Sequence, residues 1–177
     1  MAHTGQILQN PVSGETITFT QTAADTGGEL LAFELELTPD GRVPGLHVHP
    51  EQTETFRVVE GRMRFRLGLR TIEAGPGDVV TVPPGAAHKF TNAGGEIARA
   101  RVEVRPALEM EQLLETAVRL AEEGRTLRSG MPRPLALAQF TRRFRREVRG
   151  PFPPAWVQQL TMAPLARLAR TPLPAGP

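Results

Sequence analysis

The amino-acid sequence predicts a mainly β fold, a sandwich or barrel of short strands that continues into an α-helical extension. Up to about residue 105, apolar and polar side chains alternate in short runs between Gly- and Pro-rich turns, which is typical of antiparallel sheets. After Pro106 the apolar residues recur about every 3.6 positions, which indicates helices. The net charge changes at the same point, from −3 over residues 1–105 to +5 over residues 106–177. We therefore expect a β-barrel at 1–105 and a helical extension at 106–177.

Three runs show the strand alternation most clearly. In each run every second side chain is apolar and is expected to face the core, while the residues between face solvent. The apolar members are Leu31, Phe33, Leu35 and Leu37 in the first run, Met63, Phe65 and Leu67 in the second, and Ala98, Ala100, Val102 and Val104 in the third. The residues that alternate with the second apolar run are Arg62, Arg64 and Arg66. We expect this solvated face to pair with Glu34 and Glu36.

The extension predicts three helices. The first lies within residues 108–124 and ends at Gly124, a residue suited to the turn that follows a helix. The second runs from 134 to 148, and the third from 155 to 169, where Pro164 is expected to kink or split it. The apolar stripes are Met110, Leu113, Leu114, Ala117, Leu120 and Ala121 in the first helix and Leu137, Phe140, Phe144 and Val148 in the second. Both stripes should dock, on the barrel or on a second chain, whereas the Pro-rich tail PLPAGP should be loose.

The composition narrows the class of protein. A chain of 177 residues with 40% hydrophobic and 23% charged residues suits one globular domain with an appendage. It has no cysteine, which excludes disulfides, thiolate nucleophiles and thiolate metal sites. The first residues lack the apolar core of a signal peptide, and no window reaches the roughly 18 to 20 apolar residues of a membrane span. We expect a soluble, cytoplasmic protein.

Three histidines and one glutamate have the spacing of a metal site. His47 and His49 are two residues apart, so on a strand both rings point to one face. Glu54 shares the parity of the apolar residues that follow it, and a carboxylate on an apolar face needs something to compensate its burial. His88 comes after a tight PPG turn that returns the chain to the same wall. Three imidazoles and one carboxylate suit a divalent Fe, Mn, Ni, Co, Cu or Zn ion.

These residues also carry a resemblance to the cupin family, which is described by two motifs. The first motif is matched by Gly41-x5-His47-x-His49-x4-Glu54-x6-Gly61, and the second by Gly77-x5-Pro83-x-Gly85-x2-His88-x3-Asn92. Every specified position agrees, and fifteen residues separate the two motifs, as in compact bacterial members. The motifs span residues 41–92, and the flanking strands extend the likeness to about 15–105.

The resemblance implies a double-stranded β-helix, which is a jelly-roll barrel, with His47, His49, Glu54 and His88 holding one divalent metal ion per chain. The sequence is also similar, through less specific features, to the quercetin-dioxygenase-like group of small bacterial cupins. This likeness implies a metal-dependent dioxygenase that acts on a small aromatic or enolic substrate, with Glu54 also the catalytic base. The apolar substrate pocket would be formed by Phe56, Val58, Met63, Phe65 and Phe90.

Several alternatives stay open at this point. The barrel can bind or sense a metal-bound metabolite without turnover, or catalyse a metal-dependent isomerase or lyase reaction. A metal-free cupin would use the same histidines to bind an organic ligand, as sugar-nucleotide epimerase relatives do.

The basic run RRFRREVR at residues 142–149 invites a nucleic-acid or membrane interpretation. Phe144 interrupts the charges at helical spacing from Phe140 and Val148, which favours an amphipathic helix that docks on the barrel or on a partner subunit. We therefore expect a small-molecule ligand, no nucleic acid, no stable membrane association and a homodimer. The arginine face at 62, 64 and 66 or the helical extension would supply the dimer surface.

Overall fold

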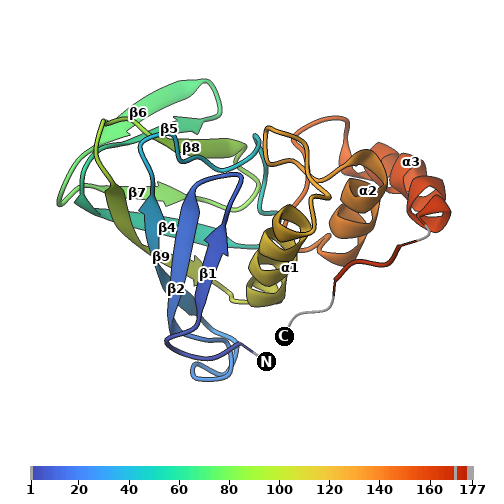
Figure 1. Cartoon of the computed structure of the whole chain (residues 1–177), viewed down its shortest axis with the longest axis horizontal. Coiled ribbons are helices and arrows are strands. Elements are labelled where there is room, and N and C mark those ends of the chain that lie inside the picture. The colour runs from blue at the N-terminus through green and yellow to red at the C-terminus, as the bar shows by residue number, and fades with distance from the viewer. Residues whose placement is uncertain (1, 170, 175–177) are drawn as a thin grey trace.

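The computed structural model describes residues 2–169 and 171–174 (Figure 1). Within them the chain forms nine strands followed by three helices. In chain order these are β1 (Ile7–Asn10), β2 (Glu15–Gln21), β3 (Leu31–Leu37), β4 (Thr53–Glu60), β5 (Met63–Leu67), β6 (Arg70–Ala74), β7 (Val79–Val82), β8 (His88–Asn92), β9 (Ala98–Arg105), α1 (Met110–Glu122), α2 (Pro134–Arg143) and α3 (Ala155–Leu168).

The strands form two antiparallel sheets. The larger has the order β1-β2-β3-β9-β4-β7, and the smaller has the order β6-β5-β8. Strands distant in sequence are neighbours, since β9 lies between β3 and β4, and β8 pairs with β5. This arrangement confirms the predicted mainly β fold with helices at its C-terminal end.

The core follows the predicted alternation. Along β9 buried and exposed residues alternate without a break, and the four apolar residues predicted to face inward on β3 are all buried. The expected pairing of the arginines at 62, 64 and 66 with Glu34 and Glu36 is wrong. Since β9 is the neighbour of β3, Glu36 pairs with Arg99 at 3.4 Å and Glu34 with Arg101 at 3.8 Å.

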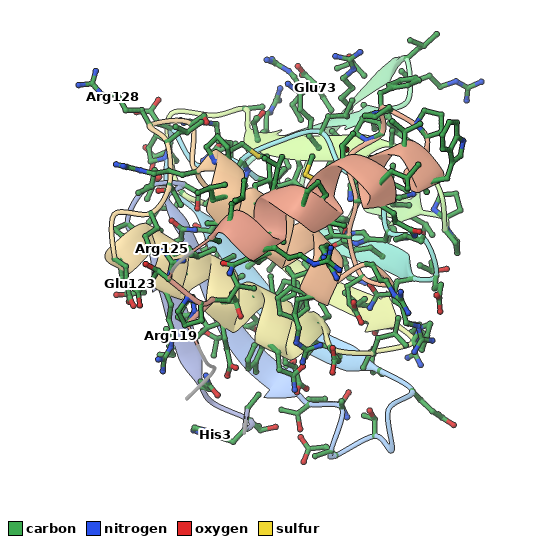
Figure 2. All side chains as sticks on the ribbon, turned by 90° about the vertical axis from the view of Figure 1, so that its right-hand side faces the viewer. His3, Glu73, Arg119, Glu123, Arg125 and Arg128 are labelled. Atoms are coloured by element: carbon green, nitrogen blue, oxygen red, sulfur yellow. The ribbon has the colours of Figure 1, made fainter. Side chains whose placement is uncertain are left out.

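The helices lie together at one end of the barrel (Figures 1 and 2). Helix α1 packs beside β1, and its buried apolar side chains join the core cluster of the barrel. Gly124 ends this helix with a φ of +65°, and the next residue, Arg125, donates its main-chain N–H to the carbonyl of Leu120 at 2.8 Å. The predicted first helix and its glycine terminus are thus confirmed.

The other two helices differ from the prediction. Helix α2 ends at Arg143 rather than at residue 148, because the chain turns there and Arg149 pairs through its main chain with Val48 of the barrel. Pro164 lies inside α3 without dividing it. Of the Pro-rich tail, residues 175–177 lie outside the described part of the chain. Among the described helices, none combines the length and the apolarity needed to cross a bilayer.

Candidate metal centre

The structure brings His47, His49, Glu54 and His88 together inside the barrel. One nitrogen or carboxylate oxygen from each side chain lies within 4.8 Å of the others. The two first histidines come from the extended segment before β4, Glu54 from β4 itself, and His88 from the start of β8. Residues 41 positions apart in the sequence are thereby placed in one cluster, as the sequence predicted.

Main-chain hydrogen bonds explain how the cluster forms. His47 and His88 pair as in an antiparallel ladder, with N–H to carbonyl distances of 3.0 and 2.8 Å. Gly85 donates its N–H to the carbonyl of His49 at 2.8 Å, and its φ of +80° lets the chain turn back towards the cluster. Only glycine adopts such a conformation without strain. The turn before β8 therefore sets where His88 enters the barrel.

The three imidazoles share one hydrogen-bonding pattern. Each Nδ1 lies close to a main-chain carbonyl: His47 to Gly45 at 2.9 Å, His49 to Glu147 at 2.6 Å, and His88 to Ala86 at 3.2 Å. A carbonyl only accepts, so these contacts assign the ring proton to Nδ1. The Nε2 lone pairs are then directed to the centre, which is the arrangement that metal-binding histidines commonly adopt.

Burial and mutual charge shift the ionisation of the cluster. Burial by itself would raise the pKa of Glu54, but the approach of the His88 and His49 rings, whose Nε2 atoms lie 3.0 and 3.5 Å from Glu54 Oε2, outweighs it and holds that pKa below its usual value. Burial opposes a charge on His49, yet the nearby negative charge of Glu54 raises the pKa of that ring. Burial, together with the two neighbouring imidazoles, lowers the pKa of His47 to about 3. Glu54 is therefore anionic and His47 neutral, the forms in which both bind metals.

One buried atom of the cluster lacks a protein partner. His49 Nε2 makes no hydrogen bond within the described structure and lies 3.5 Å from Glu54 Oε2, beyond good hydrogen-bonding distance. A lone pair that faces a carboxylate in a buried site is unfavourable unless a proton or a metal cation lies between them. The donor set of three imidazole nitrogens and one carboxylate oxygen suits a divalent transition-metal ion.

A cavity of about 290 Å³ opens directly on the cluster. Three of the four candidate ligands line it, and His88 lies behind them, fully buried. Of the five residues predicted to form an apolar pocket, Phe56 and Phe90 line this cavity. The other three, Val58, Met63 and Phe65, are buried in the barrel core and are not part of its wall.

The helical extension supplies much of the cavity wall, including Met110, Leu113, Leu114, Ala117, Leu137 and Phe140. These residues belong to the predicted apolar stripes, which therefore face the barrel. The cavity is lined mainly by apolar side chains, and its polar lining includes three candidate ligands and, from the extension, Arg149 and Gln158. A cavity of this size and lining favours a small, largely apolar ligand.

Two features of the site were not anticipated from the sequence. The first is Glu15 on β2, which lines the same cavity and accepts a hydrogen bond from Ser13 Oγ at 2.5 Å. Burial raises the pKa of Glu15 to about 7, and the charge of Glu54 adds to this effect. Glu15 has the same strand parity as the inward-facing Ile17 and Phe19, and this pattern was a usable signal.

The second feature is the approach of residues 147–149 to the histidines. The carbonyl of Glu147 accepts from His49 Nδ1, and Val48 and Arg149 exchange two main-chain hydrogen bonds of 2.9 and 3.0 Å. Residues about a hundred positions apart thus meet beside the candidate ligands. No motif in the sequence marks this contact, because it depends on main-chain atoms that every residue carries.

Glu15 makes the stability of the metal-free protein depend on pH. The unfolded chain ionises this carboxyl near pH 4.5, whereas the folded chain keeps its proton to about pH 7. Between these values the unfolded state binds fewer protons, so the free energy of unfolding falls as the pH rises. Glu15→Gln should remove this pH dependence. From pH 4 to pH 8 its free energy of unfolding should rise relative to that of wild type by up to about 3 kcal/mol, and by less if water enters the cavity.

Urea denaturation at several pH values with a chelator present measures this effect, because a bound cation would itself lower the pKa of Glu15. Glu29→Gln, which changes an exposed carboxylate, is the matched control and should follow wild type. Equal pH slopes for Glu15→Gln and wild type would contradict the assignment.

The fold and the cluster define a class: a double-stranded β-helix with a three-histidine, one-glutamate site near one mouth. Residues 33–104 match the family model described as Cupin domain. This part of the chain is a cupin domain, as the two sequence motifs predicted. No protein with a curated function matches the chain.

Solved structures agree on the fold. An RmlC-like cupin from Shewanella frigidimarina is 18% identical, with a TM-score of 0.52 over 63% of this chain and 96% of that one. A structure from Thermotoga maritima described as a predicted oxalate decarboxylase is 19% identical, with a TM-score of 0.52 over 58% of this chain and 92% of that one. KdgF from Halomonas sp. is 15% identical, with a TM-score of 0.51 over 59% of this chain and 91% of that one. At such identities the likeness concerns the fold alone.

Proposed function

We propose that the protein is a metal-dependent enzyme for a small aromatic or enolic molecule, of the dioxygenase type. The observation that carries the proposal is that three of the candidate metal ligands line a cavity whose wall is otherwise mainly apolar. A substrate that fits there presents an oxygen to the centre and its apolar body to the walls. Both requirements are met by an enol or a phenol.

His47, His49, Glu54 and His88 would hold one divalent ion per chain, with the open side of the centre towards the cavity. When bound, the ion would supply Lewis-acid and redox chemistry for a substrate oxygen and for dioxygen. Glu54 is anionic and lies on the cavity wall, so it can accept the proton of a substrate hydroxyl. Phe56 and Phe90 offer flat apolar surfaces against which a planar substrate can pack.

Oxygen uptake tests the proposal. The protein, loaded separately with Fe, Mn, Ni, Co, Cu or Zn, is presented with a panel of flavonols, catechols and β-diketones. We expect oxygen consumption that depends on both the metal and the substrate, and that Glu54→Gln reduces. Binding of panel compounds without oxygen uptake would instead favour the non-catalytic binding or sensing role.

The second carboxyl in the cavity favours one alternative, a metal-dependent isomerase or lyase. Burial raises the pKa of Glu15, whereas the neighbouring histidines lower that of Glu54, so the cavity holds two carboxyl groups with separated pKa values. Such a pair can move a proton between two positions of one substrate. Turnover of a panel compound without oxygen uptake would select this alternative over the dioxygenase.

We also propose that the protein is a homodimer. Of the two surfaces considered, the arginine face is partly occupied within its own sheet, where Arg64 pairs with Glu73 at 2.8 Å. The extension exposes large apolar side chains on and beside α3, among them Phe152, Trp156 and Leu160. Light scattering at micromolar concentration should give twice the chain mass, and Trp156→Glu should shift it towards the monomer. A wild-type monomer throughout that range would refute the proposal.

A further inference from the structure

The basic run at residues 142–149 is not used by the proposed function, and its arginines separate into two groups. Two of them attach the segment to carboxylates elsewhere in the chain. Arg143 forms an ion pair with Glu109, and Arg146 forms one with Glu51 at 2.7 Å. These contacts account for two of the positive charges in the run and fix the position of the segment beside the barrel.

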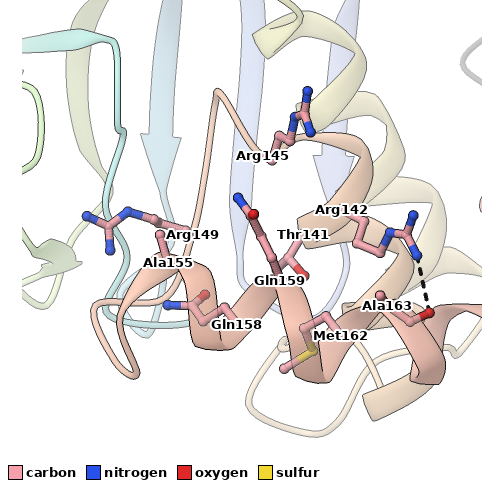
Figure 3. A pocket seen from close by; sticks show the side chains of 9 residues that line it. All are labelled: Thr141, Arg142, Arg145, Arg149, Ala155, Gln158, Gln159, Met162 and Ala163. Atoms are coloured by element: carbon pink, nitrogen blue, oxygen red, sulfur yellow. Dashed lines mark hydrogen bonds between the residues drawn. The ribbon is translucent and has the colours of Figure 1, made fainter.

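The other three arginines line a separate cleft between α2 and α3, with a volume of about 280 Å³. Figure 3 shows Arg142 and Arg149 on opposite sides of this cleft and Arg145 above it. The carboxamide side chains of Gln158 and Gln159 stand between them. The residues that line the cleft include no acidic side chain.

The positive charge of the cleft is not neutralised within the described part of the chain. Arg142 Nη1 donates to the carbonyl of Ala163 at 3.2 Å, and Arg149 Nη1 to the carbonyl of Gly150 at 3.4 Å. These main-chain acceptors carry no net charge. Arg145 has no side-chain hydrogen bond or ion pair among residues 2–169 and 171–174. Three like charges on one short segment repel one another, and an anion between them would relieve that repulsion.

We propose that this cleft binds a small molecule that carries two or more anionic groups, such as phosphates, sulfonates or carboxylates. The arginines stand on different sides of the cleft, so one anionic group cannot satisfy all of them where they lie. Each guanidinium offers a planar fork of donors that matches such a group, and the two carboxamides can donate as well. Anion binding here does not depend on a metal ion in the histidine cluster.

The cleft adjoins the cavity of the metal centre. Thr141, Arg149, Gln158 and Met162 contribute to the walls of both. The main chain of Arg149 is also hydrogen-bonded to Val48, between the first two candidate ligands. A ligand bound in the cleft would therefore contact the segment that also contacts His49. Its binding can change the shape of the cavity through that segment.

Isothermal titration of the full chain with propane-1,3-disulfonate tests the proposal, because this dianion coordinates metals poorly. Propane-1-sulfonate provides the comparison with a single anionic group. We expect the disulfonate to bind at least about tenfold more tightly, since a charged hydrogen bond typically accounts for a tenfold change or more. Arg145→Gln should weaken binding about tenfold, and Arg145→Glu should abolish it.

Arg145 makes no side-chain hydrogen bond or ion pair with the described residues that its replacement would break, so both variants should melt at the wild-type temperature. Arg62→Glu is the matched control, because Arg62 is also an exposed arginine and the change in net charge is the same. It should leave disulfonate binding unchanged. An equal loss of disulfonate affinity in Arg62→Glu and Arg145→Glu, or no binding of the disulfonate to wild type, would overturn the proposal. Binding to phosphatidylglycerol vesicles without binding of the disulfonate would overturn it in favour of a membrane contact.

Discussion

His49→Ala is expected to lower the affinity for divalent metal by more than about a hundredfold. Replacing a residue that only orients a ligand commonly costs 10- to 100-fold, and the loss of a ligand itself should exceed this. His49 Nε2 is buried without a protein hydrogen bond, so the wild-type site contains a nitrogen that is available to a metal cation. Metal analysis of untagged protein, followed by competition with a chelator of known affinity, measures the change.

Glu15→Gln is the matched control for this experiment, because Glu15 lines the same cavity but is not one of the four clustered side chains. It should retain its metal. Saturating metal should raise the melting temperature of wild type and of Glu15→Gln, because a ligand that binds only the folded state stabilises it. The melting temperature of His49→Ala should not respond. Full metal retention by His47→Ala, His49→Ala and His88→Ala would disprove the ligand assignment.

Arg149→Pro is expected to weaken metal binding by about tenfold or more, although residue 149 contributes no ligand. Proline removes the N–H that Arg149 donates to the carbonyl of Val48, at 3.0 Å. This hydrogen bond holds the segment whose Glu147 carbonyl accepts from His49 Nδ1. Loss of an orienting partner of a ligand typically costs 10- to 100-fold in affinity. The same chelator competition measures the effect.

Arg149→Ala separates the main chain from the side chain in this experiment. It removes the guanidinium but keeps the N–H, so its metal affinity should equal that of wild type. If Arg149→Pro also bound metal normally while folding to the same stability, the extension would have no part in positioning His49. The sequence alone suggested that the helices supply no ligand, and the contact of Glu147 with His49 refines this to an indirect role.

The sequence predicted the cluster well because the patterns that indicate it involve residues only a few positions apart. Alternation of apolar residues identifies the strands, and the spacing of His47 and His49 places both rings on one face. Glycines such as Gly85 mark turns that few other residues tolerate. These patterns depend on side-chain type within a few positions, so they can be read before the fold is known.

The remaining features depend on contacts between distant parts of the chain. The end of α2 at Arg143 follows from the pairing of Arg149 with Val48, which helical periodicity cannot reveal. The predicted pocket residues Val58, Met63 and Phe65 had the correct inward parity, but inward positions in a barrel differ in depth. Only some of them reach the cavity, and the others fill the core.

The shared wall of the cavity has a consequence for how this protein can diversify. The candidate ligands come from residues 47–88, whereas Met110, Leu113, Leu114 and other wall residues come from the helices. Substitutions in the helices can therefore change the size and shape of the accepted molecule while the ligands keep their positions. A barrel that retains one chemistry could acquire new substrates by replacing a few helical side chains, without any change in the strands.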